Sequence, residues 1–481
     1  LRAGSGAPMF RRSHPDRTHD SNGIMASRSP GSPATRMTPI ELRSSLALAS
    51  VSGLRLFGMF VILPVFALFA EGLPGGQDQR LVGLALGVYG LTQAVLQIPF
   101  GWLSDRLGRK PTLYAGLLVF ALGSFLAAMA TTIHGVILGR MVQGAGAVSA
   151  AAIALTADLT REEVRTKAMA IIGITIGVMF ALSMAVGPVL DRLIGVPGIF
   201  AMTGVLALGA VAMVRFAVPQ PPTILTTEAR PRVAEVFADR ELLRLNVGIF
   251  VIHAALMALF VVIPGMLRDA GLSAQDQWKL YFPVMSAAFL LIIPVIAIAE
   301  RQHRLKLAFI GSIVLLGAGV GLLAVASASI MLIGIGLLIF FKAFNFLEAS
   351  LPSLTSRLAP ARAKGTAAGV FASVQYLGTF AGGAAGGFIS HAYGPGAVFV
   401  TCGVVIALWF LVAVGMSVPV VRSYPVPLMD DGRIPGLVQR LRALPGVREV
   451  LQVSPGGTAQ LKVDMARFDE DNALRLIQKE I

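Results

Sequence analysis

The chain has 481 residues, of which 55% are hydrophobic and 14% are charged. Soluble domains carry about 25% charged residues, so this composition excludes an ordinary soluble protein. The formal net charge of +14 does not indicate nucleic-acid binding, because the basic residues lie in short loops and form no face with stacking aromatic side chains. Continuously apolar stretches of about 20 residues recur along the chain, which indicates a polytopic membrane protein built from helices.

The first 45 residues are rich in Ser, Pro, Gly and Arg and contain no apolar run. We predict that residues 1–45 form a disordered basic leader. This segment lacks the apolar core of a secretory signal. Met25 and Met37 are alternative starts of the chain.

Twelve apolar spans follow, and a polar, proline-rich segment divides them into six and six. The pattern predicts an all-α membrane fold with an N-terminal half (46–217), a cytoplasmic linker (218–241) and a C-terminal half (242–418). The expected spans are 46–70, 81–104, 112–130, 135–157, 168–190, 197–217, 242–264, 279–299, 306–325, 330–354, 366–390 and 396–418.

Basic residues concentrate in alternate loops, which orients the spans. The positive-inside rule therefore predicts an inner (plasma) membrane protein with both termini in the cytoplasm. The loops expected in the cytoplasm carry Arg106, Arg109 and Lys110; Arg161, Arg165 and Lys167; Arg230, Arg232 and Arg240; Arg301, Arg304 and Lys306; and Arg357, Arg362 and Lys364. The other loops carry only Arg80, Arg192, Arg268 and Lys279.

The two halves resemble each other at one point. Span 4 ends in Leu-Thr-Ala-Asp-Leu (155–159) and span 10 ends in Leu-Thr-Ser-Arg-Leu (354–358). The match falls where a parallel six-plus-six repeat would place it. Chance similarity of so short a segment is the alternative.

The segment from residue 419 to 481 changes character. Residues 424–429, 447–453 and 458–464 have the pattern of strands, while 433–444 and the stretch after Asp469 have the pattern of helices. The order β-α-β-β-α predicts a small α+β ferredoxin-like cytoplasmic domain without a clear last strand. Its role is either to bind an unknown regulator or to add stability.

The run from Gly101 to Pro111 packs four ionic groups and two glycines between two apolar spans. Together with the twelve spans, it resembles the loop 2–3 signature of the major facilitator superfamily, Gly-x-x-x-Asp-Arg-x-Gly-Arg-Lys. The signature residues are Gly101, Asp105, Arg106, Gly108, Arg109 and Lys110.

Two further motifs resemble those of proton-coupled members of this superfamily. Arg140, Gln143, Gly144 and Gly146 match a span 4 motif, and span 5 matches part of the drug:proton antiporter motif with Gly173, Gly177, Gly187 and Pro188. The antiporter match is partial, because Val189-Leu190-Asp191 replaces the expected glycines. The tail and the Phe344–Ala349 segment of span 10 are similar to the YajR-type branch.

The resemblance implies a latch on the cytoplasmic side. Asp105 would face the N-terminus of span 11, where a carboxylate meets a positive helix end. Arg109 would pair with Asp158, Gly101 would let helices approach, and Gly108 would allow the tight turn. The alternative is a solvated loop whose charges only set the topology.

Charged groups inside a membrane span are costly unless they are paired, so they are functional candidates. Arg140, with Gln143 beside it, would bind backbone carbonyls of span 1 and respond to a proton site, unless it snorkels to the surface. Arg55 lies near the middle of span 1 and requires a partner or a cavity.

Span 10 carries Lys342, Asn345 and Glu348 at positions i, i+3 and i+6. We predict that Glu348 exchanges protons and that Lys342 and Asn345 contact substrate, with Arg55. The alternative is an ion-pair network that only fixes helix packing. Weaker cavity candidates are Gln93, Gln97 and Gln375.

Glycines of spans 5 and 11 have the small-xxx-small spacing that favours close helix contact, and Pro188 would kink span 5 next to Gly187. The glycines of span 11 are Gly378, Gly382, Gly383, Gly386 and Gly387.

These features predict a secondary transporter that exports small amphipathic compounds in exchange for protons by alternating access. A substrate:proton importer or facilitator, or a non-transporting membrane sensor, is the alternative. We expect no enzyme activity, cofactor or metal, because the chain has neither a nucleotide-binding loop nor a zinc motif. The expected partners are the lipid bilayer, a small-molecule substrate and protons.

Overall fold

A computed structural model describes residues 36–220, 233–301, 304–326, 329–359, 363–416, 421–427, 443–453 and 458–464. Ten segments in this part of the chain are long and apolar enough to cross a membrane. One of them, Lys167–Ala217, holds two spans, and the glycine-rich helix of span 11 adds another. All twelve predicted spans are therefore helical.

The N-terminal half forms spans 1 to 6. Spans 1 and 4 are each interrupted, at residues 61–62 and 146–148, and spans 5 and 6 are one segment that bends at Gly195, whose φ is +68°. The helices are α1 (Pro39–Phe60), α2 (Leu63–Glu71), α3 (Gln79–Arg106), α4 (Arg109–Ala128), α5 (Ile133–Ala145), α6 (Ser149–Asp158) and α7 (Glu162–Ala217).

The C-terminal half forms spans 7 to 12, one helix to each span. A short helix precedes it, and a single 3-10 turn lies between spans 7 and 8. The elements are α8 (Val233–Ala238), α9 (Arg240–Asp269), η2 (Ala274–Asp276), α10 (Trp278–Arg301), α11 (Leu305–Val325), α12 (Ile330–Leu358), α13 (Lys364–Tyr393) and α14 (Pro395–Val414).

The first helix begins earlier than the sequence predicted. Thr38 and Glu41 form a capping box, in which each side chain accepts a hydrogen bond from the other residue's backbone N–H. Residues 39–45 therefore belong to α1 and not to a disordered leader. The predicted linker is also partly helical, since α8 and the first two residues of α9 fall inside 218–241.

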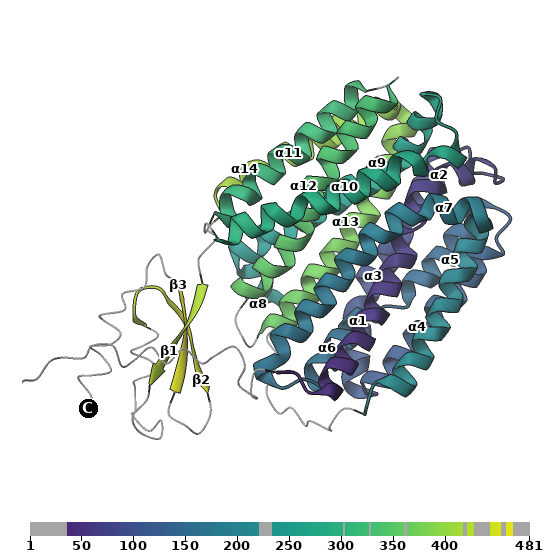
Figure 1. Cartoon of the computed structure of the whole chain (residues 1–481). Coiled ribbons are helices and arrows are strands. Elements are labelled where there is room, and N and C mark those ends of the chain that lie inside the picture. The colour runs from purple at the N-terminus through teal and green to yellow at the C-terminus, as the bar shows by residue number, and fades with distance from the viewer. Residues whose placement is uncertain are drawn as a thin grey trace, which may run out of the picture.

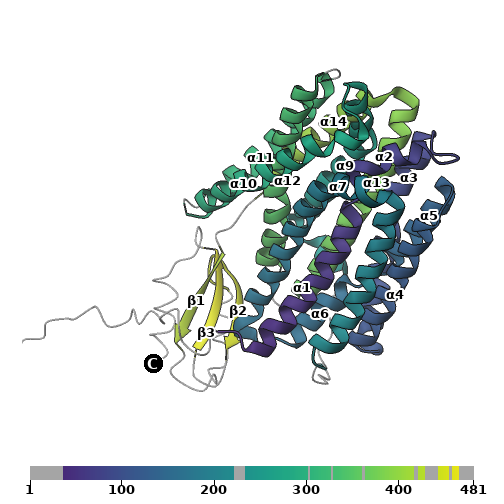
Figure 2. The same ribbon diagram turned by 45° about the vertical axis from the view of Figure 1, so that its right-hand side comes forward.

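The two halves lie side by side, and α13 contacts both α3 of the N-terminal half and α9 of its own half (Figures 1 and 2). We call the end of the bundle with the start of α1, the α3–α4 turn and the end of α14 the basic end. The end with the α2–α3, α9–α10 and α13–α14 turns is called the opposite end.

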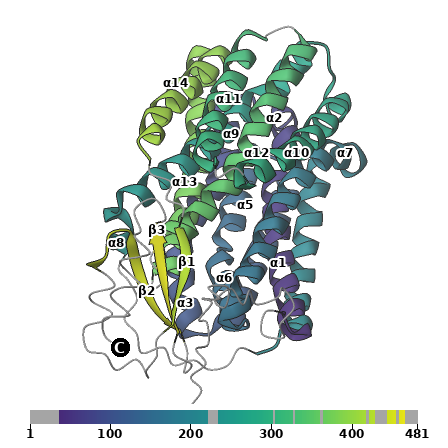
Figure 3. The same cartoon turned by 60° about the vertical axis from the view of Figure 1, so that its left-hand side comes forward.

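Within its described residues, the tail forms three strands in one antiparallel sheet (Figure 3). The strands are β1 (Val421–Pro427), β2 (Val447–Val453) and β3 (Thr458–Asp464), and β3 lies between the other two. Because β1 and β2 are both antiparallel to β3, they run parallel to each other. The two helices expected in the tail lie outside the described residues, apart from Ala443 and Leu444.

Candidate functional site

The glycines of α13 bring backbones of the two halves into contact. A Cβ atom added at Gly83 of α3 would lie 2.2 Å from the carbonyl oxygen of Gly383, and one at Gly387 would lie 2.4 Å from that of Gln79. On its other side α13 touches α9, where a Cβ at Gly382 would lie 2.0 Å from the carbonyl oxygen of Ala254. Larger residues would separate these helices, so the small-residue spacing in span 11 is confirmed as a packing device.

An aromatic layer fills the interface next to these contacts. Phe60 and Phe180 of the N-terminal half meet edge to face at 4.8 Å between ring centroids. Phe180 also lies 5.2 Å from Phe344 and 6.4 Å from Phe341, both on α12. These rings are buried, so apolar packing joins the halves on the side of the interface toward the opposite end.

Two ion pairs join the halves at the opposite end itself. Arg268 at the end of α9 pairs with Glu71 at the end of α2. His391 of α13 lies 3.7 Å from Asp78, the N-cap of α3. Arg80 binds the same Asp78 carboxylate and holds the pKa of Asp78 at about 2, so this carboxylate stays ionised at any physiological pH.

The signature loop lies at the basic end and forms a compact charge cluster. Arg109 donates to Asp158 at 2.9 Å and also binds Asp105 and Ser104. The predicted Arg109–Asp158 pair is thus present, and it lies within the N-terminal half. Gly108 has a φ of +96°, which other residues adopt only with strain.

Gly101 and Arg106 of the signature are less constrained by contacts with other helices. A Cβ at Gly101 would make only an ordinary contact, 3.6 Å from Ala150, so close helix approach does not require glycine there. The Arg106 guanidinium lies 4.0 Å from the ring centroid of the exposed Trp102. The predicted contact of Asp105 with the start of span 11 remains a prediction.

Arg140 lies in a closed polar network inside the N-terminal half. Its side chain donates to Gln143 at 2.8 Å and to the carbonyls of Ala85 and Leu86 at 3.4 Å. The residue is completely buried, so the snorkelling alternative is wrong. The expected carbonyls of span 1 are also wrong, because the carbonyls that accept belong to α3.

Arg55 connects the two halves through neutral groups. Its guanidinium donates to Ser149 of α6 and to the Tyr376 hydroxyl of α13. Gln93 is a third partner of Arg55. In the orientation of the Gln93 amide that satisfies both of its polar atoms, the amide oxygen accepts a hydrogen bond from Arg55 and the amide nitrogen donates to the Gly144 carbonyl. Arg55 is 4% exposed, so a buried cation lies at the centre of the molecule.

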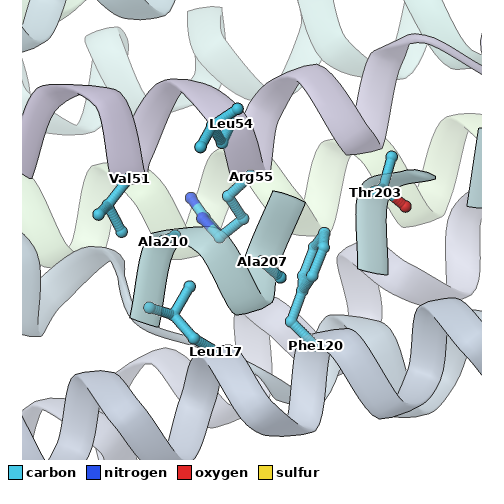
Figure 4. Close-up of a pocket in the computed structure, with 8 residues that line it drawn as sticks. All are labelled: Val51, Leu54, Arg55, Leu117, Phe120, Thr203, Ala207 and Ala210. Atoms are coloured by element: carbon cyan, nitrogen blue, oxygen red, sulfur yellow. The ribbon is translucent and has the colours of Figure 1, made fainter. Parts of the chain in front are cut away.

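A small cavity of ≈ 10 Å³ adjoins Arg55 within the N-terminal half (Figure 4). Its wall is apolar except for Arg55 and Thr203. The other lining residues are Val51, Leu54, Leu117, Phe120, Ala207 and Ala210. This volume suits at most one water molecule, so the cavity is not a substrate site.

Glu348 belongs to a three-residue group that joins α9, α12 and α13. Gln375 donates to the Glu348 carboxylate at 3.3 Å and lies 2.8 Å from Nε2 of His253. Nδ1 of His253 lies 3.1 Å from the Ile249 carbonyl oxygen, so that nitrogen carries the hydrogen and Nε2 accepts from Gln375. The bare Nε2 is 3.7 Å from the second carboxylate oxygen of Glu348.

Sequence reasoning missed His253. A signal was available, because His253 is the only histidine well inside a predicted span. Its side chain is buried and lies beside Phe344, at 5.7 Å between ring centroids. The histidine thus lies where the polar group meets the aromatic layer.

The remaining cavity candidates are less completely bonded. Lys342 and Asn345 are half-buried, and neither forms an ion pair or hydrogen bond in the described part of the chain. Gln97 is buried, and both polar atoms of its amide are without a partner among the described residues. The structure therefore gives Arg55, Gln93, Gln375 and Glu348 hydrogen-bond partners. Lys342, Asn345 and Gln97 have none among the described residues.

Span 5 only partly follows its prediction. A Cβ at Gly187 would lie 2.3 Å from the carbonyl oxygen of Val61, which confirms close packing there. Gly173 and Gly177 have no such neighbour within 4 Å, so their predicted packing role is wrong. The backbone stays helical at Pro188 and departs from helix at Gly195; a gating role for Pro188 remains a prediction.

Known proteins resemble this chain over most of its length. The chain is 40% identical to the inner membrane transport protein YajR of Escherichia coli K12 over 449 residues, which is 92% of this chain and 99% of YajR. It is 27% identical to the multidrug resistance protein MdtH of Aeromonas hydrophila over 72% of this chain and 87% of MdtH.

Solved structures share the fold. A bacterial homologue of the human lysosomal transporter Spinster, in an inward-facing and occupied conformation, superposes with a TM-score of 0.64 at 14% identity, covering 79% of this chain and 97% of that one. The family model of the Major Facilitator Superfamily matches residues 48–383. The chain therefore belongs to the Major Facilitator Superfamily and is a multi-pass transporter of the inner membrane.

Proposed function

We propose that this protein is a proton-coupled exporter of small amphipathic compounds and that Glu348 and His253 carry the proton. The observation behind this proposal is the approach of an unprotonated imidazole nitrogen to a carboxylate, 3.7 Å apart in the membrane interior. A proton on Glu348 would be shared with His253, and Gln375 would hold the two groups in place. Its loss would leave an ionised carboxylate that favours a different arrangement of the halves.

We infer that the basic end faces the cytoplasm, because the arginines and lysines of the loops gather there. The opposite end would then be the periplasmic end, which glycine contacts, aromatic rings and two ion pairs close. This arrangement supports an inward-facing state as the one described. In the exporter cycle, substrate enters this state from the cytoplasm as the proton leaves.

Two observations support export over import. MdtH, a relative over most of this chain, is named a multidrug resistance protein. The span 5 glycines and Pro188 resemble the antiporter motif, although that motif is incomplete. The latch role of Asp105 and Arg109 and the coupling role of Arg140 and Gln143 are part of the same proposal.

We further propose that the tail is a ferredoxin-like cytoplasmic domain that binds a regulator. The order β1-β3-β2, with parallel outer strands, supports a crossover between β1 and β2 of the split β-α-β type.

The test is flux of fluorescent dyes in proteoliposomes under an imposed pH gradient. Glu348→Gln is neutral and keeps the size of the side chain, so gradient-driven flux should fall at least about tenfold while exchange without a gradient continues. Glu348→Asp keeps the titrating group and is the matched control. Unchanged gradient-driven flux in Glu348→Gln would show that another group couples the proton.

A further inference from the structure

Three basic side chains gather at the basic end of the N-terminal half, where spans 1, 3 and 6 meet. Arg43 of α1 donates to the carbonyl of Phe216 at 3.2 Å, and Lys110 of α4 donates to the carbonyl of Val218 at 2.6 Å. Arg215 of α7 is close enough for its charge to act on Lys110. The two carbonyls are two residues apart in the chain and thus at most about 7 Å apart in space. The three basic residues are called the cation group below.

The protein does not neutralise the cation group. Arg43, Lys110 and Arg215 form no ion pair with a carboxylate in the part of the chain that the structure describes. Glu41 is only two residues from Arg43, but its carboxylate pairs with Arg161 at 2.9 Å. The carbonyl end of a helix supplies only about half a negative charge. An excess of positive charge therefore remains at the end of span 6.

The C-terminal half has an arginine in the matching place, and there a carboxylate compensates it. Arg244 lies five residues after the N-cap of α9, as Arg43 lies five residues after the N-cap of α1. Arg244 also donates to a carbonyl at the end of the last span of its half, that of Gly415 at 2.5 Å. It pairs with Glu241 at 2.8 Å as well. Of these two arginines, only Arg43 lacks a carboxylate partner among the described residues.

Apolar side chains on the outside of the bundle adjoin the cation group. Leu42, Leu46 and Phe216 are 43%, 49% and 77% exposed. Exposed apolar side chains at the ends of membrane spans lie against acyl chains. Arg43 and Arg215 are exposed on the same helices, and the Arg215 guanidinium lies 5.9 Å from the centroid of the Phe216 ring. The two arginines therefore extend from apolar segments to the depth of the lipid headgroups.

We propose that the cation group binds the headgroup of an anionic phospholipid, whose acyl chains lie against Leu42, Leu46 and Phe216. The phosphodiester supplies the missing negative charge, and guanidinium groups bind phosphate oxygens through paired N–H donors. A zwitterionic lipid brings a positive charge along with its phosphate, so it compensates the group less well. A free phosphate ion has no apolar part to contact the exposed side chains.

The leaflet follows from the orientation proposed above. With the basic end in the cytoplasm, the bound lipid belongs to the cytoplasmic leaflet, where clusters of Lys and Arg recognise anionic lipids. The binding itself depends neither on this orientation nor on proton coupling.

The experiment uses the full chain in detergent, freed of bound lipid, and measures lipid binding by native mass spectrometry. The probes are phosphatidylglycerol and phosphatidylcholine with the same acyl chains, which are anionic and zwitterionic. We expect the first phosphatidylglycerol to bind at least about tenfold more tightly than the first phosphatidylcholine, because more than one basic residue contributes. Equal affinity of the two lipids would overturn the inference.

Two pairs of substitutions test the cation group itself. Arg43→Gln with Arg215→Gln keeps the buried Lys110 and should lower the affinity for phosphatidylglycerol at least about tenfold, with no change for phosphatidylcholine. Arg43→Lys with Arg215→Lys keeps both charges and should retain most of the affinity. Thermal unfolding of each variant reports whether it is folded.

The matched control removes the same net charge elsewhere. Arg244→Gln with Arg268→Gln changes two arginines that pair with carboxylates, and it should lower the affinity for phosphatidylglycerol less than about threefold. Equal losses in this control and in Arg43→Gln with Arg215→Gln would mean that the net charge of the protein selects the lipid, and would contradict the inference.

Two further comparisons identify the ligand and separate this inference from the proposed function. Glycerol 3-phosphate carries the phosphate without acyl chains and should not displace phosphatidylglycerol at the same concentration; displacement would assign the group to a soluble phosphate and refute the lipid site. Lipid binding is measured without transport. A loss of proton-driven flux therefore refutes the proposed function alone, and equal binding of the two lipids refutes the lipid site alone.

Discussion

The two ends of the interface between the halves are built differently. At the opposite end, backbone meets backbone at Gly83 and Gly383, and the Glu71–Arg268 and Asp78–His391 pairs cross from one half to the other. At the basic end, the Arg109–Asp158, Arg161–Glu41 and Arg244–Glu241 pairs each join residues of one half. The contacts at the opposite end join the two halves to each other. The ion pairs at the basic end stabilise each half by itself.

This difference indicates which contacts stabilise the closed opposite end. Exposed ion pairs contribute only about 0–1 kcal/mol each, and both pairs at the opposite end are partly exposed. Glycine contacts between backbones cannot adapt to added atoms, because no flexible side chain lies between them. Packing should therefore contribute most of the free energy that keeps the opposite end closed, and the ion pairs should contribute little.

The largest effect is expected from Gly83→Val. The new Cβ would lie 2.2 Å from the Gly383 oxygen, so α3 and α13 would have to separate and the opposite end would stay open. We expect transport to fall more than about tenfold, a free-energy change above roughly 1.4 kcal/mol. A cysteine at Thr379, which is now completely buried, should become reactive toward a membrane-impermeant thiol reagent.

The chain offers matched controls for this test. Gly311→Val adds the same side chain to a membrane helix where a Cβ meets nothing within 4 Å, and it should change neither readout. Cys402 is the single cysteine and is buried, so Cys402→Ser provides a silent background. A fully active Gly83→Val protein with an unreactive cysteine would show that closure does not depend on this contact.

A smaller effect is expected from Asp105→Asn at the basic end. This change removes one of the two carboxylates that hold Arg109 and weakens the proposed latch. We expect a severalfold loss of transport and greater accessibility of the basic end, measured by thiol labelling from that side. Arg244→Gln, at the same end but outside the signature loop, is the control; equal effects of the two changes would argue against a latch.

Much of the fold was predictable because the spans are set by local sequence, namely the length and apolar character of each segment. Span length follows from membrane thickness, whereas the Arg109–Asp158 pair follows from the resemblance of the loop to the superfamily signature. His253 could not be assigned, because its role depends on Gln375 and Glu348, which reach it from helices distant in the sequence. Spacing also misjudged Gly173, because spacing does not say which helix face meets a neighbour.

A weaker effect is expected from Arg268→Gln. This change removes an exposed charge that crosses the interface, so it should shift the balance between the two states by up to about 1 kcal/mol, or roughly fivefold. The measurement is thiol labelling at Thr379→Cys. The double change Glu71→Arg with Arg268→Glu should restore the original labelling, and a failure to do so would mean that the pair does not act through its charges.

The smallest effect is expected from His391→Gln. The His391 ring lies 3.7 Å from the Asp78 carboxylate, which Arg80 already binds, so this change removes a partly exposed contact whose acceptor keeps another partner. Such contacts contribute less than about 1 kcal/mol, so labelling of Thr379→Cys should rise less than about fivefold. Asp78→Asn removes the charge that both partners share and should have the larger effect; a larger effect of His391→Gln would mean that His391 acts through another group.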